Sequence, residues 1–193
     1  IIAKNRNITH QLLDYYGIEY INRNDYPNSL IGKLFRIPIT DLFMVIKSLY
    51  FKPDIMIGFS GTNISHAGFL LRIPSIILDD TDHAYLAHLS YKFFATKIIT
   101  PKSFKKNFGK KHIKINTYSE LFYLHKKYFK PKNEVLKLLN LKNNEDYVIL
   151  RFVSWNASHD KGVKYLSNSE KKEIINYLNK KIKVFISSEY ELD

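Results

Sequence analysis

Asp54-Ile-Met-Ile-Gly-Phe-Ser-Gly-Thr-Asn63 and Ile73-Pro-Ser-Ile-Ile-Leu-Asp-Asp-Thr-Asp-His83 are the two segments of the sequence that decide the fold. Residues 54–59 and 75–78 are short apolar runs without alternation, which predicts strands covered on both faces. Residues 65–71, between the two runs, have the length and apolar content of a crossover helix. Strand, helix and strand in so short a stretch predict parallel β/α/β winding, and therefore an α/β fold.

Polar residues follow both of these predicted strands. Ser60, Gly61 and Thr62 come directly after the first strand, and Asp79 and Asp80 come directly after the second. Ligands of open parallel sheets bind beyond the carboxyl ends of the strands. We therefore expect these two turns to contribute to one functional site.

The composition limits the class of protein. The chain has 193 residues, of which 45% are hydrophobic, and it contains no cysteine. Disulfides, thiolate zinc sites and cysteine nucleophiles are therefore excluded. No apolar run approaches the roughly 20 residues that span a bilayer. We expect a soluble, cytoplasmic protein that uses neither a metal nor another cofactor.

The net charge of +12 admits several interpretations. The chain has 30 basic residues, only five of which are arginine. An excess of lysine beside abundant Ile, Asn and Tyr is typical of a general compositional bias, whereas attraction to an anionic substrate or membrane face is the second interpretation. Nucleic acid is the least favoured partner, because no nucleic-acid-binding motif occurs. The lysine-rich segment from Lys102 to Lys114 has the same alternatives: a surface for anionic lipid, peripheral to the inner face of the membrane, or an ordinary solvated face.

The rest of the chain continues the alternation of helices and strands. Ser167-Asn-Ser-Glu170 has the pattern of a capping box ahead of the last helix. The helices are expected at residues 7–16, 29–35, 40–50, 85–94 and 171–181, with a break around Pro38, and the further strands at residues 18–21, 97–100, 112–116, 147–153 and 183–187.

The chain is expected to form two domains. Residues 1–125 would form an N-terminal Rossmann-like domain without its first strand and helix, residues 126–132 a linker, and residues 133–193 the beginning of a second, incomplete Rossmann-like domain. Both domains would thus be truncated, and we expect a fragment of a longer protein or a trimmed homologue.

Several segments together resemble a little-characterised family of predicted glycosyltransferases that is distantly similar to UDP-N-acetylglucosamine 2-epimerases. The resemblance implies a GT-B fold, in which two Rossmann-like domains face each other across a cleft and the second holds most of a UDP-sugar. The segments that carry it are Asn5-Arg-Asn7, Leu12-Leu-Asp-Tyr-Tyr-Gly-Ile18, Lys52-Pro-Asp-Ile-Met-Ile-Gly-Phe-Ser-Gly61, Ile73-Pro-Ser-Ile-Ile-Leu-Asp-Asp80, Ile98-Ile-Thr-Pro101 and Leu150-Arg-Phe-Val-Ser-Trp-Asn-Ala-Ser-His-Asp160.

The motifs of the epimerases are only partly kept. Their Gly-Asp-Thr turn falls on Ser60-Gly-Thr62, where Gly61 replaces the acidic residue. Their His-Val-Glu-Ala-Gly segment keeps a carboxylate at Asp79, and their Thr-x-His-Arg-Arg-Glu-Asn segment shares only His159. Because epimerisation at C2 needs acid and base groups on both faces of the sugar, the resemblance implies altered chemistry.

The carboxylates after the second strand have two possible roles. Asp79 and Asp80 would contact sugar hydroxyls, and one of them would act as a general base on an acceptor. Alternatively, Asp80, Thr81 or Asp82 caps the next helix. In the first turn, Ser60, Gly61 and Thr62 would bind substrate through hydroxyl and amide groups, or else form an ordinary strand-to-helix turn capped by Thr62 or Asn63.

The loop after residues 147–153 is the second candidate. Arg151 and Lys161 would bind the diphosphate of a nucleotide sugar and His159 its sugar, because transfer leaves a diphosphate whose charge cations stabilise. The alternative is a solvated loop.

Together with these features, the resemblance implies a nucleotide-sugar-dependent, glycosyltransferase-like protein of surface polysaccharide or glycoconjugate synthesis, with a UDP-linked sugar as its partner. The alternatives are a UDP-N-acetylglucosamine 2-epimerase-like isomerase and a non-catalytic truncated relative.

Overall fold

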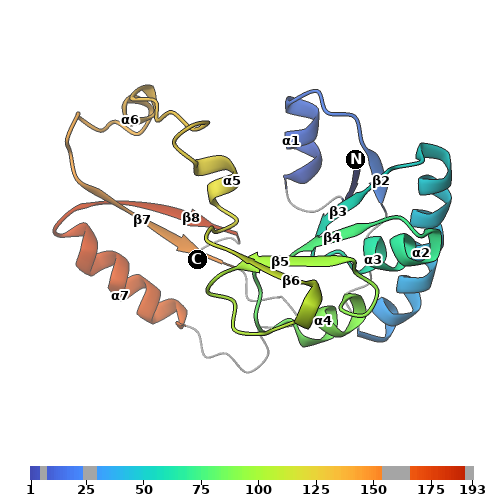
Figure 1. Cartoon of the computed structure of the whole chain (residues 1–193). Coiled ribbons are helices and arrows are strands. Elements are labelled where there is room, and N and C mark those ends of the chain that lie inside the picture. The colour runs from blue at the N-terminus through green and yellow to red at the C-terminus, as the bar shows by residue number, and fades with distance from the viewer. Residues whose placement is uncertain (5–7, 24–29, 154–165, 190–193) are drawn as a thin grey trace. The chain divides into compact units, whose positions relative to one another are not determined.

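A computed structural model of the chain describes residues 1–4, 8–23, 30–153 and 166–189 (Figure 1). The chain divides into two compact units, Ile1–Ser119 and Glu120–Asp193. Parallel sheets occur in both units, which confirms the predicted α/β class. The expected domain limits at residues 125 and 133 stay a prediction.

The first unit contains two parallel sheets. One pairs β1 with β2, and the other has the strand order β3-β4-β5-β6. The elements are β1 (Ile2–Lys4), α1 (Thr9–Tyr15), β2 (Ile21–Arg23), α2 (Leu30–Phe51), β3 (Met56–Phe59), α3 (Thr62–Leu71), β4 (Ser75–Leu78), α4 (Tyr85–Tyr91), β5 (Lys97–Pro101), the 3-10 turn η1 (Gly109–Lys111) and β6 (His112–Ile115).

The parallel winding predicted around α3 is confirmed. β3 and β4 are parallel neighbours in a register that pairs Phe59 with Leu78. Their carboxyl ends therefore lie at the same edge of the sheet, and the turns that begin at Ser60 and Asp79 start side by side. α3 packs against both α2 and α4.

The expectation that both strands are covered on both faces is wrong for β3. Its Ile57 and Phe59 are at least half exposed, whereas Ile77 of β4 is fully buried. The reason is position: in the described part of the chain β3 is the outermost strand of its sheet, and β4 lies inside it. An apolar run without alternation does not distinguish these two positions.

The break expected around Pro38 is also wrong, because α2 runs without interruption from Leu30 to Phe51. A proline inside a helix costs about 3 kcal/mol, since it removes one backbone hydrogen bond. Contacts after Pro38 offset this cost. Met44 is buried with Met56 and Ala67 in one of the two core clusters, and Asp41 binds two polar side chains of α3.

The second core cluster holds the turn after β4 in place. Ile77 of β4, Tyr91 and Ala95 after it, and Ile98 of β5 are all buried together. The strand expected at residues 18–21 lies slightly later, at β2, where Ile21 pairs with Ile2.

The second unit has one two-stranded parallel sheet, β7 with β8, in the register Tyr147 to Lys183. The predicted capping box is confirmed: Ser167 Oγ accepts from the Glu170 amide, and Glu170 accepts from the Ser167 amide. None of the helices in the described ranges is long and apolar enough to cross a membrane. The elements are α5 (Leu121–Leu124), α6 (Glu134–Leu138), β7 (Tyr147–Phe152), α7 (Asn168–Asn179) and β8 (Lys183–Ser188).

Candidate functional site

The first two candidate residues, Ser60 and Asp79, are in direct contact. Ser60 Oγ donates a hydrogen bond of 3.1 Å to Asp79 Oδ2. The Ser60 backbone adopts φ +46°, which is uncommon for a residue with a side chain, and its amide donates to the Leu78 carbonyl at 2.8 Å. Strained backbone of this kind concentrates at functional sites. The structure thus joins the two predicted turns through one hydroxyl.

Asp79 is a buried carboxylate with three donors. Its side chain is only 1% exposed, and besides Ser60 it accepts from Tyr91 Oη at 2.6 Å and from the Thr81 amide at 2.9 Å. Burying a charge is costly unless hydrogen bonds satisfy it. These partners leave Asp79 suited to hold Ser60 and the turn in position, rather than to touch a substrate.

Tyr91 is a site residue that the sequence analysis missed. Burial, together with its hydrogen bond to Asp79, raises the pKa of the Tyr91 phenol well above its usual range. The phenol therefore stays protonated and can only donate to the carboxylate. Its position in a predicted helix, 12 residues after Asp79, gave no indication of this contact.

His88 was also missed, and it lies on the other side of Asp79. Its Nδ1 is 2.7 Å from Lys106 Nζ; because an ammonium group only donates, Nδ1 accepts and Nε2 carries the proton. Burial, with the charge of Lys106 adding to it, lowers the pKa of His88. His88 Nε2 is 3.8 Å from Asp79 Oδ2, so a neutral ring packs beside the carboxylate.

Asp80 differs from Asp79 because its side chain is exposed. Oδ1 accepts from Thr81 Oγ1 at 3.1 Å, and Oδ2 accepts from Ser119 Oγ at 2.6 Å. Both partners are hydroxyl groups at the surface, which a sugar hydroxyl can replace. Of the two predicted carboxylates, Asp80 is the one that a substrate can reach.

The alternative of helix capping at this turn is wrong. α4 begins after Ala84 without a side-chain cap. The carboxylate of Asp82 instead accepts from the Lys105 amide at 2.8 Å. Capping of α3 by Thr62 or Asn63 is wrong as well, because Gly61 is its N-cap residue and no side chain caps it.

Thr62 and Gly61 contribute to packing around the first turn. Thr62 Oγ1 shares a hydrogen bond of 2.7 Å with Ser90 Oγ on α4. A Cβ atom at Gly61 would lie 3.2 Å from Ile77 Cδ1, and one at Gly58 only 2.2 Å from Ile64 Cδ1. The two glycines therefore allow α3 to pack closely on the sheet.

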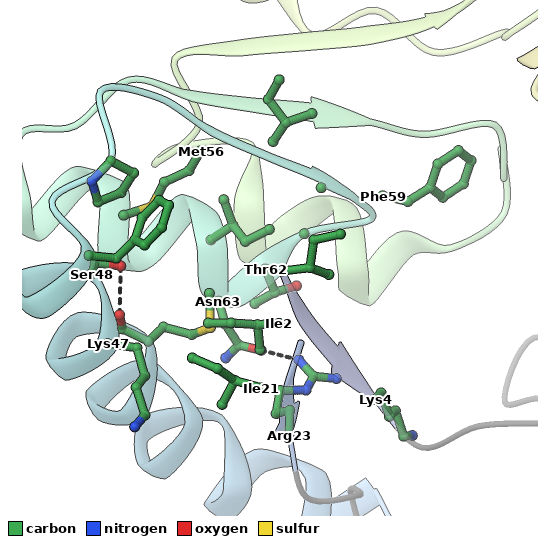
Figure 2. Close-up of a pocket in the computed structure, with 18 of the residues that line it drawn as sticks. Ile2, Lys4, Ile21, Arg23, Lys47, Ser48, Met56, Phe59, Thr62 and Asn63 are labelled. Atoms are coloured by element: carbon green, nitrogen blue, oxygen red, sulfur yellow. Dashed lines mark hydrogen bonds between the residues drawn. The ribbon is translucent and has the colours of Figure 1, made fainter. Parts of the chain in front are cut away.

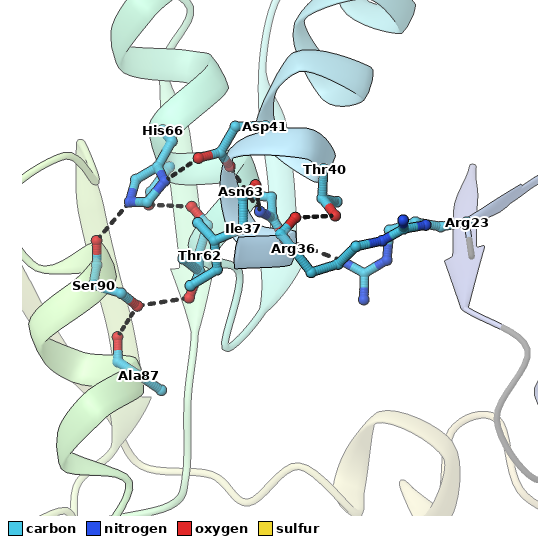
Figure 3. A network of polar contacts seen from close by, with 11 residues as sticks. Arg23, Arg36, Ile37, Thr40, Asp41, Thr62, Asn63, His66, Ala87 and Ser90 are labelled. Atoms are coloured by element: carbon cyan, nitrogen blue, oxygen red, sulfur yellow. Dashed lines mark hydrogen bonds and ion pairs between the residues drawn. The ribbon is translucent and has the colours of Figure 1, made fainter. Parts of the chain in front are cut away.

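A second polar network lies under α3 (Figure 3). Asp41 of α2 accepts from Asn63 Nδ2 at 2.7 Å and is 2.7 Å from His66 Nδ1, while His66 Nε2 is 2.8 Å from the Ser90 carbonyl. Since a carbonyl and a carboxylate only accept, both ring nitrogens carry protons. The hydrogen bond to Asp41 accordingly raises the pKa of His66. Arg23 Nη1 extends the network to β2 through Asn63 Oδ1.

A pocket of about 770 Å³ lies beside the first turn (Figure 2). Ser60, Gly61 and Thr62 line it, but Asp79 and Asp80 do not. β1 and β3 both border it, and most of its wall is apolar. Among the described residues that line it, the charged ones are the cations Lys4, Arg23 and Lys47, so this part of the pocket suits an anionic or apolar group and presents no carboxylate.

Of the site residues predicted in the second unit, Arg151 lies within the described ranges. Arg151 Nη2 forms an ion pair of 2.9 Å with Glu189 Oε1, and both side chains are more than a third exposed. An exposed pair of this kind contributes little stability, so the guanidinium can exchange Glu189 for an anionic ligand. His159 and Lys161 lie outside the described residues.

Three lysines of the lysine-rich segment form hydrogen bonds within the first unit. Lys106 contacts His88, Lys111 Nζ donates to the Phe93 carbonyl at 2.6 Å, and Lys114 Nζ donates to the Phe104 carbonyl. These lysines stabilise the turn between β5 and β6, which is a structural role. Within the ranges that the structure describes, no group of three acidic, histidine or cysteine side chains could hold a metal ion.

Known proteins resemble this chain at the level of family and fold. A family model described as "Protein of unknown function (DUF354)" matches residues 1–190. The UDP-GlcNAc 2-epimerase of Neisseria meningitidis, solved with UDP-GlcNAc bound, is 14% identical with a TM-score of 0.58, over 99% of this chain and 63% of the epimerase. MurG of Acinetobacter baumannii is 14% identical with a TM-score of 0.47, over 100% of this chain and 57% of its own.

The epimerase likeness confirms the predicted GT-B-like fold. The chain spans less than two thirds of the length of both solved structures. No curated protein is significantly similar to it in sequence.

Proposed function

We propose that the chain, which belongs to the family described as "Protein of unknown function (DUF354)", is a nucleotide-sugar-dependent, glycosyltransferase-like protein of surface polysaccharide or glycoconjugate synthesis. The observation that carries the proposal is the contact of Ser60 with Asp79 beside the exposed Asp80, at the carboxyl edge of β3 and β4. This edge is where parallel sheets bind ligands. The fold supports a UDP-linked sugar, since the similar epimerase was solved with UDP-GlcNAc bound.

In the proposed reaction Asp80 accepts a hydrogen bond from a hydroxyl of the donor sugar and is also the base for the acceptor. The acceptor hydroxyl attacks the anomeric carbon of the sugar, Asp80 takes the hydroxyl proton, and the bond to the diphosphate breaks with its electron pair leaving on the diphosphate. Ser60 and Thr62 orient the substrate with hydroxyl groups. Asp79 is a positioning residue, because it holds Ser60 and the Thr81 amide while itself buried.

The donor groups are proposed from the second unit. A diphosphate leaving group develops negative charge, which cationic donors stabilise. Arg151 is exposed, and the ion pair described for it, with Glu189, lies at the surface. We therefore propose that Arg151 binds the diphosphate. Lys161 and His159 are proposed to bind the diphosphate and the sugar, respectively.

Calorimetric titration with UDP and with a panel of UDP-sugars tests this proposal. Asp80→Asn should weaken binding of the preferred UDP-sugar about tenfold, the loss expected for one hydrogen bond to a charged group, and leave UDP binding unchanged. Asp82→Asn is the matched control, because Asp82 contacts the Lys105 amide instead. The absence of heat with every UDP-sugar, or equal binding by Asp80→Asn and the native chain, would contradict the proposal.

A UDP-N-acetylglucosamine 2-epimerase-like isomerase is the second candidate, favoured by the fold likeness to such an enzyme. An isomerase converts the nucleotide sugar without an acceptor. Following UDP-GlcNAc alone by proton NMR therefore separates the two: a new C2 epimer identifies the isomerase, whereas a transferase leaves the sugar unchanged. Gly61, in place of the acidic residue of the epimerase turn, favours the transferase.

A further inference from the structure

α2 carries an unusual second apolar face. Its inner face is buried in the first unit through Thr40, Met44 and Ser48. On the opposite side six large apolar residues are between 42% and 84% exposed. We call them the outer stripe: Phe35, Ile39, Leu42, Ile46, Leu49 and Tyr50.

The spacing of the outer stripe is that of a helix interface. Successive members from Phe35 to Leu49 are four, three, four and three residues apart, which is the repeat that keeps a seam against a partner helix. This segment is about 21 Å long at 1.5 Å per residue. A surface helix of a monomeric unit has a polar outer face, and a contiguous exposed apolar patch marks an interaction site.

We propose that two copies of this chain associate through the outer stripe, about a two-fold axis at Leu42. Leu42 is the middle one of the five members from Phe35 to Leu49, so an antiparallel pair of α2 helices places Leu42 against Leu42 and Phe35 against Leu49. An isologous interface must be complementary to itself. About this axis Phe35 and Leu49 face each other, and Ile39 and Ile46 come within one residue of facing each other.

The charges of α2 favour a second copy. The chain carries a net charge of +12, which opposes association wherever charged surfaces meet. No charged residue occurs among the six of the stripe; the charged residues of α2 are Lys33, Arg36, Asp41 and Lys47, at other positions of the helical turn. Two stripes can therefore meet without burying like charges.

A lipid surface fits the stripe less well. Membrane-surface helices carry Lys and Arg that reach toward anionic lipid beside the apolar face. In α2, Arg36 Nε is buried and Lys47 Nζ lies 5.7 Å from the Phe43 ring. Of the α2 cations whose side chains the structure describes, neither extends beside the stripe.

The size of the stripe also fits a dimer. Six side chains that each expose on the order of 100 Å² would bury about 600 Å² per copy, close to the about 800 Å² per partner of specific interfaces. The stripe would form the apolar centre of the interface, and the residues beside it would form the rim.

Light scattering after size-exclusion chromatography tests the proposal on the whole chain. The native chain should elute at twice its 22.8 kDa mass. Leu42→Glu and Leu42→Lys should each be monomers, since two like charges would meet at the axis. An equal mixture of the two should form a dimer again, which a misfolded variant could not do. Leu86→Gln, an equally exposed change on α4, is the control and should remain dimeric.

Three results would overturn the proposal. A native chain that is monomeric at every concentration would do so, whether or not it binds vesicles of anionic phospholipid. A dimer that persists in both Leu42 variants would place the interface elsewhere. Two monomeric variants that fail to pair when mixed would show that Leu42 does not meet its own copy.

Discussion

The Tyr91 hydroxyl donates a 2.6 Å hydrogen bond to the buried carboxylate of Asp79. The bond connects α4 to the turn after β4, and through Asp79 it reaches Ser60 after β3. The exposed residue Asp80 is thus attached to a turn that two buried side chains hold in place.

Tyr91→Phe is expected to lower the free energy of unfolding by about 1–3 kcal/mol, because it removes one donor from a buried carboxylate. Urea denaturation followed by circular dichroism measures this loss as a lower midpoint at an unchanged slope. Tyr85→Phe, on the exposed side of the same helix, should change the stability by no more than about 0.5 kcal/mol. Equal stability of Tyr91→Phe and the native chain would show that the phenol does not stabilise the turn.

Gly58→Ala tests the close packing of α3 on β3. The added Cβ atom would lie 2.2 Å from Ile64 Cδ1, the end of a flexible side chain, so Ile64 must leave its rotamer and the variant should be less stable by about 0.5–1.5 kcal/mol. Ile64→Val removes that methyl group. The double variant should therefore be more stable than the sum of the two single losses predicts, by about 0.5 kcal/mol or more. Strictly additive losses would contradict the contact.

His66 should make the free energy of unfolding depend on pH at values above those at which an ordinary histidine titrates. Its pKa is raised in the folded chain by the hydrogen bond to Asp41, so between about pH 6.5 and the raised pKa the folded state binds more protons than the unfolded state. The stabilising contribution is complete below about pH 6.5 and is lost as the pH rises through the folded pKa. His66→Asn and Asp41→Asn should both remove this alkaline loss, as measured by unfolding at a series of pH values.

The opposite sign applies to His88. Burial lowers the pKa of His88, so its contribution to the free energy of unfolding is complete above about pH 6.5 and is lost as the pH falls through the folded pKa.

The prediction for His66 has a clear contradicting result. A native chain whose stability does not decrease on the alkaline side relative to His66→Asn would show that His66 is not held as a cation.

The sequence predicted local structure wherever one pattern determines it. The parallel pair β3 and β4 followed from two apolar runs separated by a short helix. The capping box of Ser167 and Glu170 followed from spacing alone. The break at Pro38 did not occur, because packing of Met44 and the bonds of Asp41 are tertiary contacts that a helical pattern does not contain.

The part of the candidate site that could be predicted is the part that depends on where the strands end. Polar residues after adjacent strands predicted the meeting of Ser60 and Asp79. Which carboxylate is buried depends on Tyr91, whose side chain reaches back from the next helix. The pairing of Asp41 with His66 could not be predicted for the same reason, since their elements meet only through the packing of α2 on α3.

The proposed function depends on contact between a nucleotide sugar and the turns after β3 and β4. Amide chemical-shift mapping of the isotope-labelled chain during a titration with UDP-GlcNAc measures this contact residue by residue. Saturable shifts are expected at the amides of Ser60, Asp80 and Thr81, and Asp80→Asn should diminish them. Saturable shifts confined to other residues, or no shifts at all, would contradict it.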